Sequence, residues 1–218
     1  MKKFGDKVGL WLSGLMGGIV SSTAVSIAMG NIAKNNNNLA RRAFQATILA
    51  SSVMYLRILI LIYFINSSIA FNIWWKLFIL FLCGLILAFI VHDKKEAVKA
   101  GPLSSIQNPF EIKPAVIFAS LFVILSVVTI WVKQFWGESG LIGLSLIVGV
   151  TDIDPFILSI IGKQSILANV VNTSIIVSMM SNTLVKGIYF GSLSRTLRLK
   201  VIYYFCIWAA VHAILIFI

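Results

Sequence analysis

Seven long apolar runs divide this 218-residue chain and limit what it can fold into. A helix needs roughly 20 mostly apolar residues to cross about 30 Å of hydrocarbon, and each run is long enough. Each is expected to be helical, because a span in lipid must satisfy its own backbone hydrogen bonds and no alternating barrel pattern is present. The sequence therefore predicts an all-α integral membrane protein with seven transmembrane helices, at residues 8–30, 43–66, 70–91, 114–133, 140–162, 166–190 and 200–218.

The composition excludes several other classes of protein. Hydrophobic residues make up 59% of the chain and charged residues only 11%, whereas soluble domains carry about 25% charged residues. A soluble enzyme, a nucleic-acid-binding protein and a disordered chain are excluded. The net charge of +11 is explained by Lys and Arg residues that flank the spans and attract anionic lipid head groups. The predicted partner is therefore the lipid bilayer of a cell membrane, which is the inner membrane if the source is bacterial.

An internal repeat is visible in the sequence. A shift of 131 residues aligns the segment that starts the first span with the one that starts the fifth, with Gly18 on Gly149. A shift of 129 then places Arg57 on Lys186. The first and fifth spans are four apart and should cross in the same direction, which predicts two parallel, unequal repeats. The predicted division is 1–92 with three helices, a polar linker at 93–113, and 114–218 with four helices.

Five segments distributed along the chain resemble a known family. They are GLMGGIVSSTAVS (14–26), ASSVMYLR (50–57), NPFE (108–111), GVTDIDPFILS (149–159) and SNTLVK (181–186). The chain resembles the C-terminal membrane domain of MgtC/SapB-family proteins, a domain of unknown function, in a stand-alone version shortened at its N-terminus. It departs from the family pattern at Pro155, where a small residue usually follows the second Asp. The resemblance implies ion or solute transport.

Two carboxylates lie in the middle of the fifth predicted span, at Asp152 and Asp154. A charge at the bilayer centre costs about 2.5–3.5 kcal/mol on insertion scales, so such a group indicates a functional site. Residues two apart point to opposite sides of a continuous helix. Because Asp favours the N-cap and Pro the first helical position, Asp154-Pro155 predicts a broken helix. Asp154 would cap its second half and Asp152 would be the freer ligand, although an Asp152–Arg57 ion pair and a purely structural cap are alternatives.

The first span carries a matching pattern of small and polar residues. Gly17 and Gly18 are followed by Ser21, Ser22 and Thr23, and this stretch is expected to loosen the helix and present hydroxyl and carbonyl groups. Broken helices that meet near the bilayer midplane form ion and substrate sites in several transporters. The alternative interpretation is that these small residues only allow neighbouring helices to pack closely.

Two cations complete the predicted site. Arg57 lies near the centre of the second span and needs a carboxylate, a carbonyl or an anion as a partner. Lys186 lies nearer its helix end, where snorkelling to the membrane surface is expected. A four-residue spacing places polar residues on one face of the sixth span, where they would line a pathway or bond neighbouring helices; the members of this stripe are Ser174, Ser178, Asn182 and Lys186. His212 in the last span is interpreted as a packed or hydrogen-bonded residue.

These observations favour a small ion or solute transporter with a polar site at the midplane. The predicted binding residues are Asp152, Asp154, Ser21, Ser22, Thr23, Arg57, Asn182 and Lys186. The carboxylates suit a cation or proton, the basic side chains permit an anion, and a metal ligand set remains open. The alternative is a non-transporting regulatory or assembly subunit that pairs with a second copy or another membrane protein. No enzyme activity and no cofactor are predicted, since nucleophile, phosphate-loop and cofactor motifs are absent.

The charges do not assign an orientation to the seven-span arrangement. Lys and Arg near the span ends divide evenly between the two sides, so the positive-inside rule gives a tie. The odd number of spans predicts that the two termini lie on opposite sides of the membrane.

Overall fold

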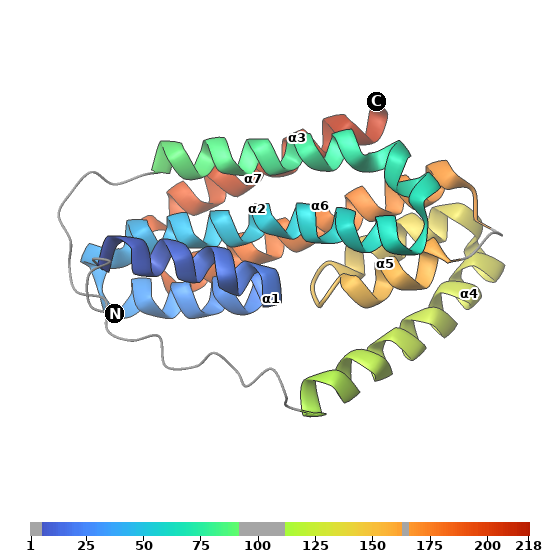
Figure 1. Ribbon diagram of the computed structural model, residues 1–218, viewed down its shortest axis with the longest axis horizontal. Helices are drawn as coiled ribbons and strands as arrows, with labels where there is room; N and C mark the ends of the chain where they lie inside the picture. Colours follow the sequence, from blue (N-terminus) through green and yellow to red (C-terminus); the bar gives the residue numbers. More distant parts are fainter. Residues whose placement is uncertain (1–5, 92–111, 163–165) are drawn as a thin grey trace.

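The computed structural model describes residues 6–91, 112–162 and 166–218 (Figure 1). These residues are almost entirely helical and contain no strand. Two short 3₁₀ turns, η1 (Asn37–Leu39) and η2 (Arg195–Leu197), lead into α2 and α7. Most of the predicted polar linker lies outside the described residues. The α-helices are α1 (Asp6–Asn35), α2 (Ala40–Ile65), α3 (Ser67–Val91), α4 (Ile112–Val148), α5 (Asp154–Ile161), α6 (Ala168–Leu193) and α7 (Arg198–Phe217).

Helix α1 is not one straight helix but two arms that fold back on each other. Ser21 interrupts it with extended backbone angles of φ −158° and ψ 104°. A methyl group placed on Gly17 would lie 2.5 Å from Cγ2 of Val25, although a straight helix would separate residues eight apart by about 12 Å along its axis. Residues 6–35 therefore form a helical hairpin, called hairpin 1, whose tip is Ser21.

A second hairpin is formed by the last part of α4 and by α5. Helix α4 turns sharply at Gly137, the one described residue with a positive φ, 61°. The chain then runs inward to Val148, passes through a non-helical stretch at 149–153, and returns as α5. Residues 138–161 are called hairpin 2. Its non-helical tip contains the break that was predicted around Asp152 and Pro155.

The two hairpins enter the bundle from opposite ends (Figure 1). The rings of Phe44 in α2 and Phe190 in α6 lie 5.4 Å apart, and the Tyr55 hydroxyl bonds Thr183 at 2.8 Å. Helices α2 and α6 are therefore antiparallel. Each hairpin packs along the helix that follows it. The first half, built on hairpin 1 and α2, therefore has the opposite direction to the second half, built on hairpin 2 and α6. The predicted parallel arrangement is wrong, because it assumed that the first and fifth predicted spans each cross the membrane once.

Within the described residues, five helices are long and apolar enough to cross a membrane, and the predicted total of seven spans is not confirmed. Residues 8–30 and 140–162 were predicted as single crossings, but the structure interrupts both of them. Each arm of hairpin 1 has 14 or 15 residues and covers only about 22 Å. The five candidates are Gly14–Asn35, which contains the Ser21 break, Asn37–Ile65, Ser67–Val91, Ala119–Val148, which contains the Gly137 turn, and Arg195–Phe217.

Candidate functional site

The tip of hairpin 1 presents the start of a helix to the middle of the bundle. Ser21 has the extended conformation of an N-cap, and its Oγ accepts a hydrogen bond from the Ala24 N–H at 3.2 Å. A hydroxyl in this position satisfies one of the unpaired N–H groups at a helix start. The loosening predicted for this stretch is therefore a complete break, with Ser21 as the cap of the second arm.

The tip of hairpin 2 also places a helix start at the middle of the bundle. Helix α5 begins at Asp154, with Pro155 in its first turn. Asp152 lies in the non-helical stretch, and its Oδ1 accepts a long hydrogen bond of 3.4 Å from the Asp154 N–H. The predicted role of Asp154 therefore needs correction, because it is the first residue of α5 rather than its cap. Asp152 lies in the unwound stretch as predicted, and it contacts the backbone N–H of Asp154.

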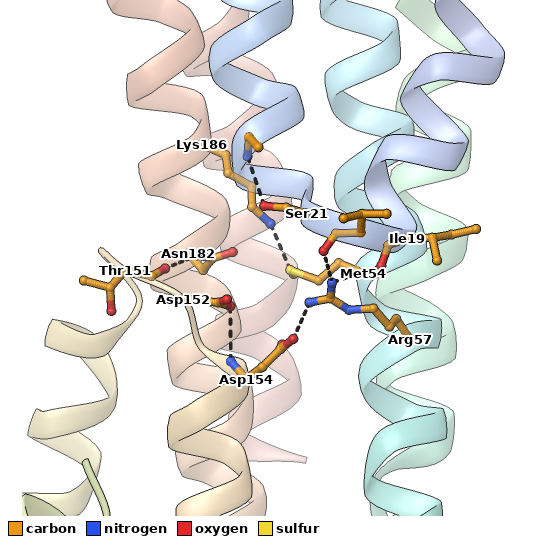
Figure 2. A network of polar contacts seen from close by, with 11 residues as sticks. Ile19, Ser21, Met54, Arg57, Thr151, Asp152, Asp154, Asn182 and Lys186 are labelled. Atoms are coloured by element: carbon orange, nitrogen blue, oxygen red, sulfur yellow. Dashed lines mark hydrogen bonds and ion pairs between the residues drawn. The ribbon is translucent and has the colours of Figure 1, made fainter. Parts of the chain in front are cut away.

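Arg57 joins the two tips (Figure 2). One terminal nitrogen donates to the carbonyls of Ile19 and Val20 in hairpin 1, at 3.1 and 3.0 Å. The other donates to Oδ2 of Asp154 in hairpin 2, at 2.6 Å. The alternative pairing of Arg57 with Asp152 is not formed, because the start of α5 turns the Asp154 carboxylate towards α2. One side chain from α2 thus holds both hairpins at their breaks.

Helix α6 holds the tip of hairpin 2 in a similar way. The Asn182 amide donates to the carbonyls of Gly149 and Thr151, at 3.0 and 3.1 Å. The Ser181 hydroxyl donates to the Leu146 carbonyl at 2.6 Å. These carbonyls lie where the inward arm of the hairpin ends and lacks helical partners. In each half, a polar side chain of the long helix therefore binds the carbonyl end of the preceding arm.

Lys186 lies deep in the bundle, which corrects the prediction that it snorkels. Its side chain is fully buried, and its Nζ contacts the Met54 thioether sulfur at 2.8 Å (Figure 2). A thioether is only a weak acceptor. Among the described residues, the ion pair that forms is Arg57–Asp154. Lys186 is therefore a buried amino group with an uncharged partner, beside the place where the hairpins meet.

A small cavity of about 10 Å³ lies between the two tips. This volume is close to that needed for a single water-sized particle. The cavity brings together residues from both hairpins, α2 and α6, and its lining consists of Val20, Ser21, Ser22, Thr23, Met54, Arg57, Asp152, Ile153 and Asn182.

Most of the predicted site residues meet at this place. Six of the eight line the cavity, Asp154 reaches it through Arg57, and Lys186 through Met54. The packing interpretation also holds for the glycines, since a methyl group on Gly18 would lie 2.6 Å from the Cα of Ala50. The Ile19 and Val20 carbonyls of this stretch nevertheless bond Arg57, and residues 21–23 line the cavity, so packing and site formation coexist.

The sequence reasoning expected a carbonyl among the possible partners of Arg57 without saying which one, and it missed the thioether. No pattern identifies the carbonyls of Ile19 and Val20, because every residue carries one. Met54 lies one turn before Arg57, but a methionine in an apolar run is usually a packing residue. Within the described part of the chain, no group of three His, Cys, Asp or Glu side chains is placed to hold a metal ion.

Comparisons with known proteins place the chain in a family. A family model described as "Domain of unknown function (DUF4010)" matches residues 1–194. The chain belongs to this family. It is also 31% identical over 190 residues to an "Uncharacterized protein" of Aquifex aeolicus (strain VF5), with 84% of this chain and 83% of that protein covered. No solved structure matches the chain. The resemblance of this DUF4010 protein to the MgtC/SapB family is shown by neither match and stays a prediction.

Proposed function

We propose that this DUF4010 protein is a small ion transporter and that the cavity between the hairpin tips is its binding site. The observation that carries the proposal is the meeting of two broken helical hairpins, from opposite ends of the bundle, at the Arg57–Asp154 ion pair. Discontinuous helices that meet near the midplane are a recurring way to build ion and substrate sites in transporters. The unwound backbone there supplies polar groups that a continuous helix would engage itself.

The size of the cavity favours an ion over an organic solute. A space of about 10 Å³ accommodates one water-sized particle, whereas sites for drug-sized molecules occupy hundreds of cubic ångströms. Hydroxyl-bearing residues from hairpin 1 and a carboxylate from hairpin 2 line this space. We therefore propose a dehydrated ion as the transported species.

The state of the hydrogen-bond groups favours a cation. The terminal nitrogens of Arg57 and the Asn182 amide already donate to backbone carbonyls, and Arg57 also donates to Asp154, while the buried Nε of Arg57 has no partner. Asp152 accepts one long bond, and the buried Oδ1 of Asp154 has no hydrogen-bond partner. Unused oxygen acceptors suit a hard cation. Asp152 would bind the cation most directly. The buried Lys186 would supply a counter-charge to the carboxylates.

The opposite directions of the two halves support a transport cycle. We propose that the halves form an inverted repeat, in place of the parallel repeat predicted from the sequence. Gly18 packs on Ala50 and Gly149 packs on Ser181, and each partner is 32 residues further along the chain. In transporters with inverted repeats, the halves exchange conformations and expose one site to each side in turn.

Ion flux in liposomes tests this proposal. The purified protein is expected to raise the flux of at least one ion in a panel of H⁺, Li⁺, Na⁺, K⁺, Mg²⁺ and Cl⁻. Asp152→Asn should return that flux to the rate of protein-free liposomes, because it removes the cation-binding charge. The matched control is Glu138→Gln, since Glu138 is exposed beside the Gly137 turn.

Each other outcome has a definite meaning. Flux of Cl⁻ that depends on Arg57 and not on Asp152 would reverse the sign of the proposed ion. A folded protein that moves no ion in the panel, or moves ions equally well as Asp152→Asn, would overturn the transporter proposal. The non-transporting regulatory or assembly subunit would then be the better interpretation.

A further inference from the structure

The fold gathers basic side chains at one end of the bundle. This end, called the basic end, is where hairpin 1 leaves, α2 starts, α6 ends and α7 starts. Antiparallel packing defines it, since Phe44 near the start of α2 contacts both Phe190 near the end of α6 and Phe205 in α7. The basic residues with described side chains at this end are Lys34, Arg41, Arg42, Arg195, Arg198 and Lys200.

Fewer basic side chains are described at the opposite end. The Lys76 Nζ donates to the Leu215 carbonyl in the last turn of α7. Lys133 lies one turn beyond Thr129, whose hydroxyl bonds Ser159 near the end of α5. These are the two basic residues with described side chains at this end, against six at the basic end, and all but one of the six are exposed.

Further basic residues adjoin these ends along the chain. Three lysines precede or open hairpin 1, and three more follow the last residue of α3 within eight positions. The link from α5 to α6 contains one lysine. In chain order, the first two groups adjoin helix ends at the basic end, and the single lysine adjoins helix ends at the other. In the seven-span arrangement, Lys and Arg divide evenly between the two sides of the membrane. This even division disappears when both hairpins return to the side from which they enter.

We propose that the basic end faces the cytoplasm and binds the anionic lipid head groups of the inner leaflet. Short cytoplasmic loops are rich in Lys and Arg, and this bias sets the orientation of membrane proteins. The cytoplasmic leaflet carries negative lipids that attract such residues. Hairpin 1 then opens to the inside and hairpin 2 to the outside, and α7 ends outside. This orientation does not depend on what the protein transports.

Labelling of single cysteines tests the orientation in intact bacterial cells. The background is the full chain with Cys83→Ala and Cys206→Ala. Four exposed positions serve as probes: Asn38→Cys and Ser192→Cys at the basic end, and Ser139→Cys and Ala168→Cys at the other. A membrane-impermeant maleimide is expected to label the second pair in intact cells. It should label the first pair roughly tenfold or more weakly until the cells are permeabilised.

The pairing of the labels separates two kinds of failure. Labelling of Asn38→Cys and Ser192→Cys from outside, with the other pair protected, would overturn the orientation and leave the fold intact. A split within each pair is what seven single crossings would produce, and it would overturn the re-entrant hairpins themselves. Neither result depends on flux, so the transporter proposal is tested separately.

Lipid retention tests the binding of head groups. Protein is reconstituted in vesicles of mixed phosphatidylglycerol and phosphatidylcholine, re-extracted, and analysed for bound lipid by native mass spectrometry. The wild type is expected to retain phosphatidylglycerol in excess, and the triple variant Arg195→Gln, Arg198→Gln, Lys200→Gln should lose this enrichment. The control Arg195→Lys, Arg198→Lys keeps the charge and should keep the enrichment. Equal retention by all three proteins would overturn the lipid contact.

Discussion

Arg57 is the residue on which the centre of the molecule depends most. It reaches from α2 to two carbonyls of hairpin 1 and to the carboxylate of Asp154 in hairpin 2. The Arg57 and Asp154 side chains are 24% and 13% exposed, so the pair is mostly removed from solvent. Breaking a buried pair leaves an uncompensated charge, which costs more than the intact pair contributes. The two residues should therefore behave as one unit.

We expect Arg57→Gln to lower the free energy of unfolding by about 3 kcal/mol, because Asp154 then loses its charged partner. Asp154→Asn in the same chain should recover part of this loss, with a coupling of about 1–3 kcal/mol. Denaturant unfolding in detergent micelles measures both values. Arg198→Gln, which changes an exposed cation, should stay within about 0.5 kcal/mol. Strictly additive effects of the two site variants would show that the ion pair contributes nothing.

At the scale of the elements, the sharp turn into hairpin 2 depends on one glycine. Gly137 has φ 61° and ψ −148°, a region that is open essentially to glycine alone. A methyl group at this position would meet no atom within 4 Å. The requirement for glycine therefore comes from the backbone conformation and not from packing.

We expect Gly137→Ala to destabilise the protein by about 1–3 kcal/mol through backbone strain. Gly143 is the matched control, because a methyl group there also meets no atom within 4 Å while the backbone is helical. Gly143→Ala should stabilise the protein by up to about 1 kcal/mol. Thermal unfolding of the two variants in one detergent makes the comparison. Equal shifts for both would contradict the role given to the turn.

At the scale of the whole molecule, a buried polar network ties the two halves together away from the cavity. The Tyr55 hydroxyl of α2 bonds the Thr183 hydroxyl of α6 at 2.8 Å and Nε2 of His212 in α7 at 3.0 Å. His212 Nδ1 also contacts the Trp208 carbonyl at 2.8 Å, which confirms the interpretation of His212 as a hydrogen-bonded residue. The network joins one helix of the first half to two of the second.

Tyr55→Phe isolates the contribution of this network, because it removes only the hydroxyl. The ring centroids of Tyr55 and Trp208 lie 5.5 Å apart, and the phenylalanine ring can keep this contact. The substitution leaves Thr183 and His212 without their shared partner, and we expect a loss of about 1–3 kcal/mol in the free energy of unfolding. Tyr63→Phe is the control, since Tyr63 is exposed, and it should change stability by less than about 0.5 kcal/mol. A similar loss in the two variants would argue against the network.

Hydropathy predicted four of the helices closely. The predicted spans at 43–66, 70–91, 166–190 and 200–218 differ from α2, α3, α6 and α7 by at most three residues at each boundary. Local apolar length is sufficient for this, because any such run must be helical in lipid. The residues of the site were also recognisable, since Asp152, Asp154 and Arg57 are charges inside apolar runs and such charges are costly.

Hairpin formation and charge partners depended on contacts between distant residues. An apolar run with a break has the same hydropathy whether its second half continues across the membrane or turns back. The contact of Gly17 with Val25 and the packing of Gly18 on Ala50 show that hairpin 1 turns back on itself. The depth of Lys186 depends on Met54 in another helix. Local chemistry was sufficient to predict the helical membrane class and the charged residues of the site. Only tertiary contacts decided the hairpins, the opposite directions of the halves and the Arg57–Asp154 pairing. The energy of these features arises between segments that hydropathy treats separately.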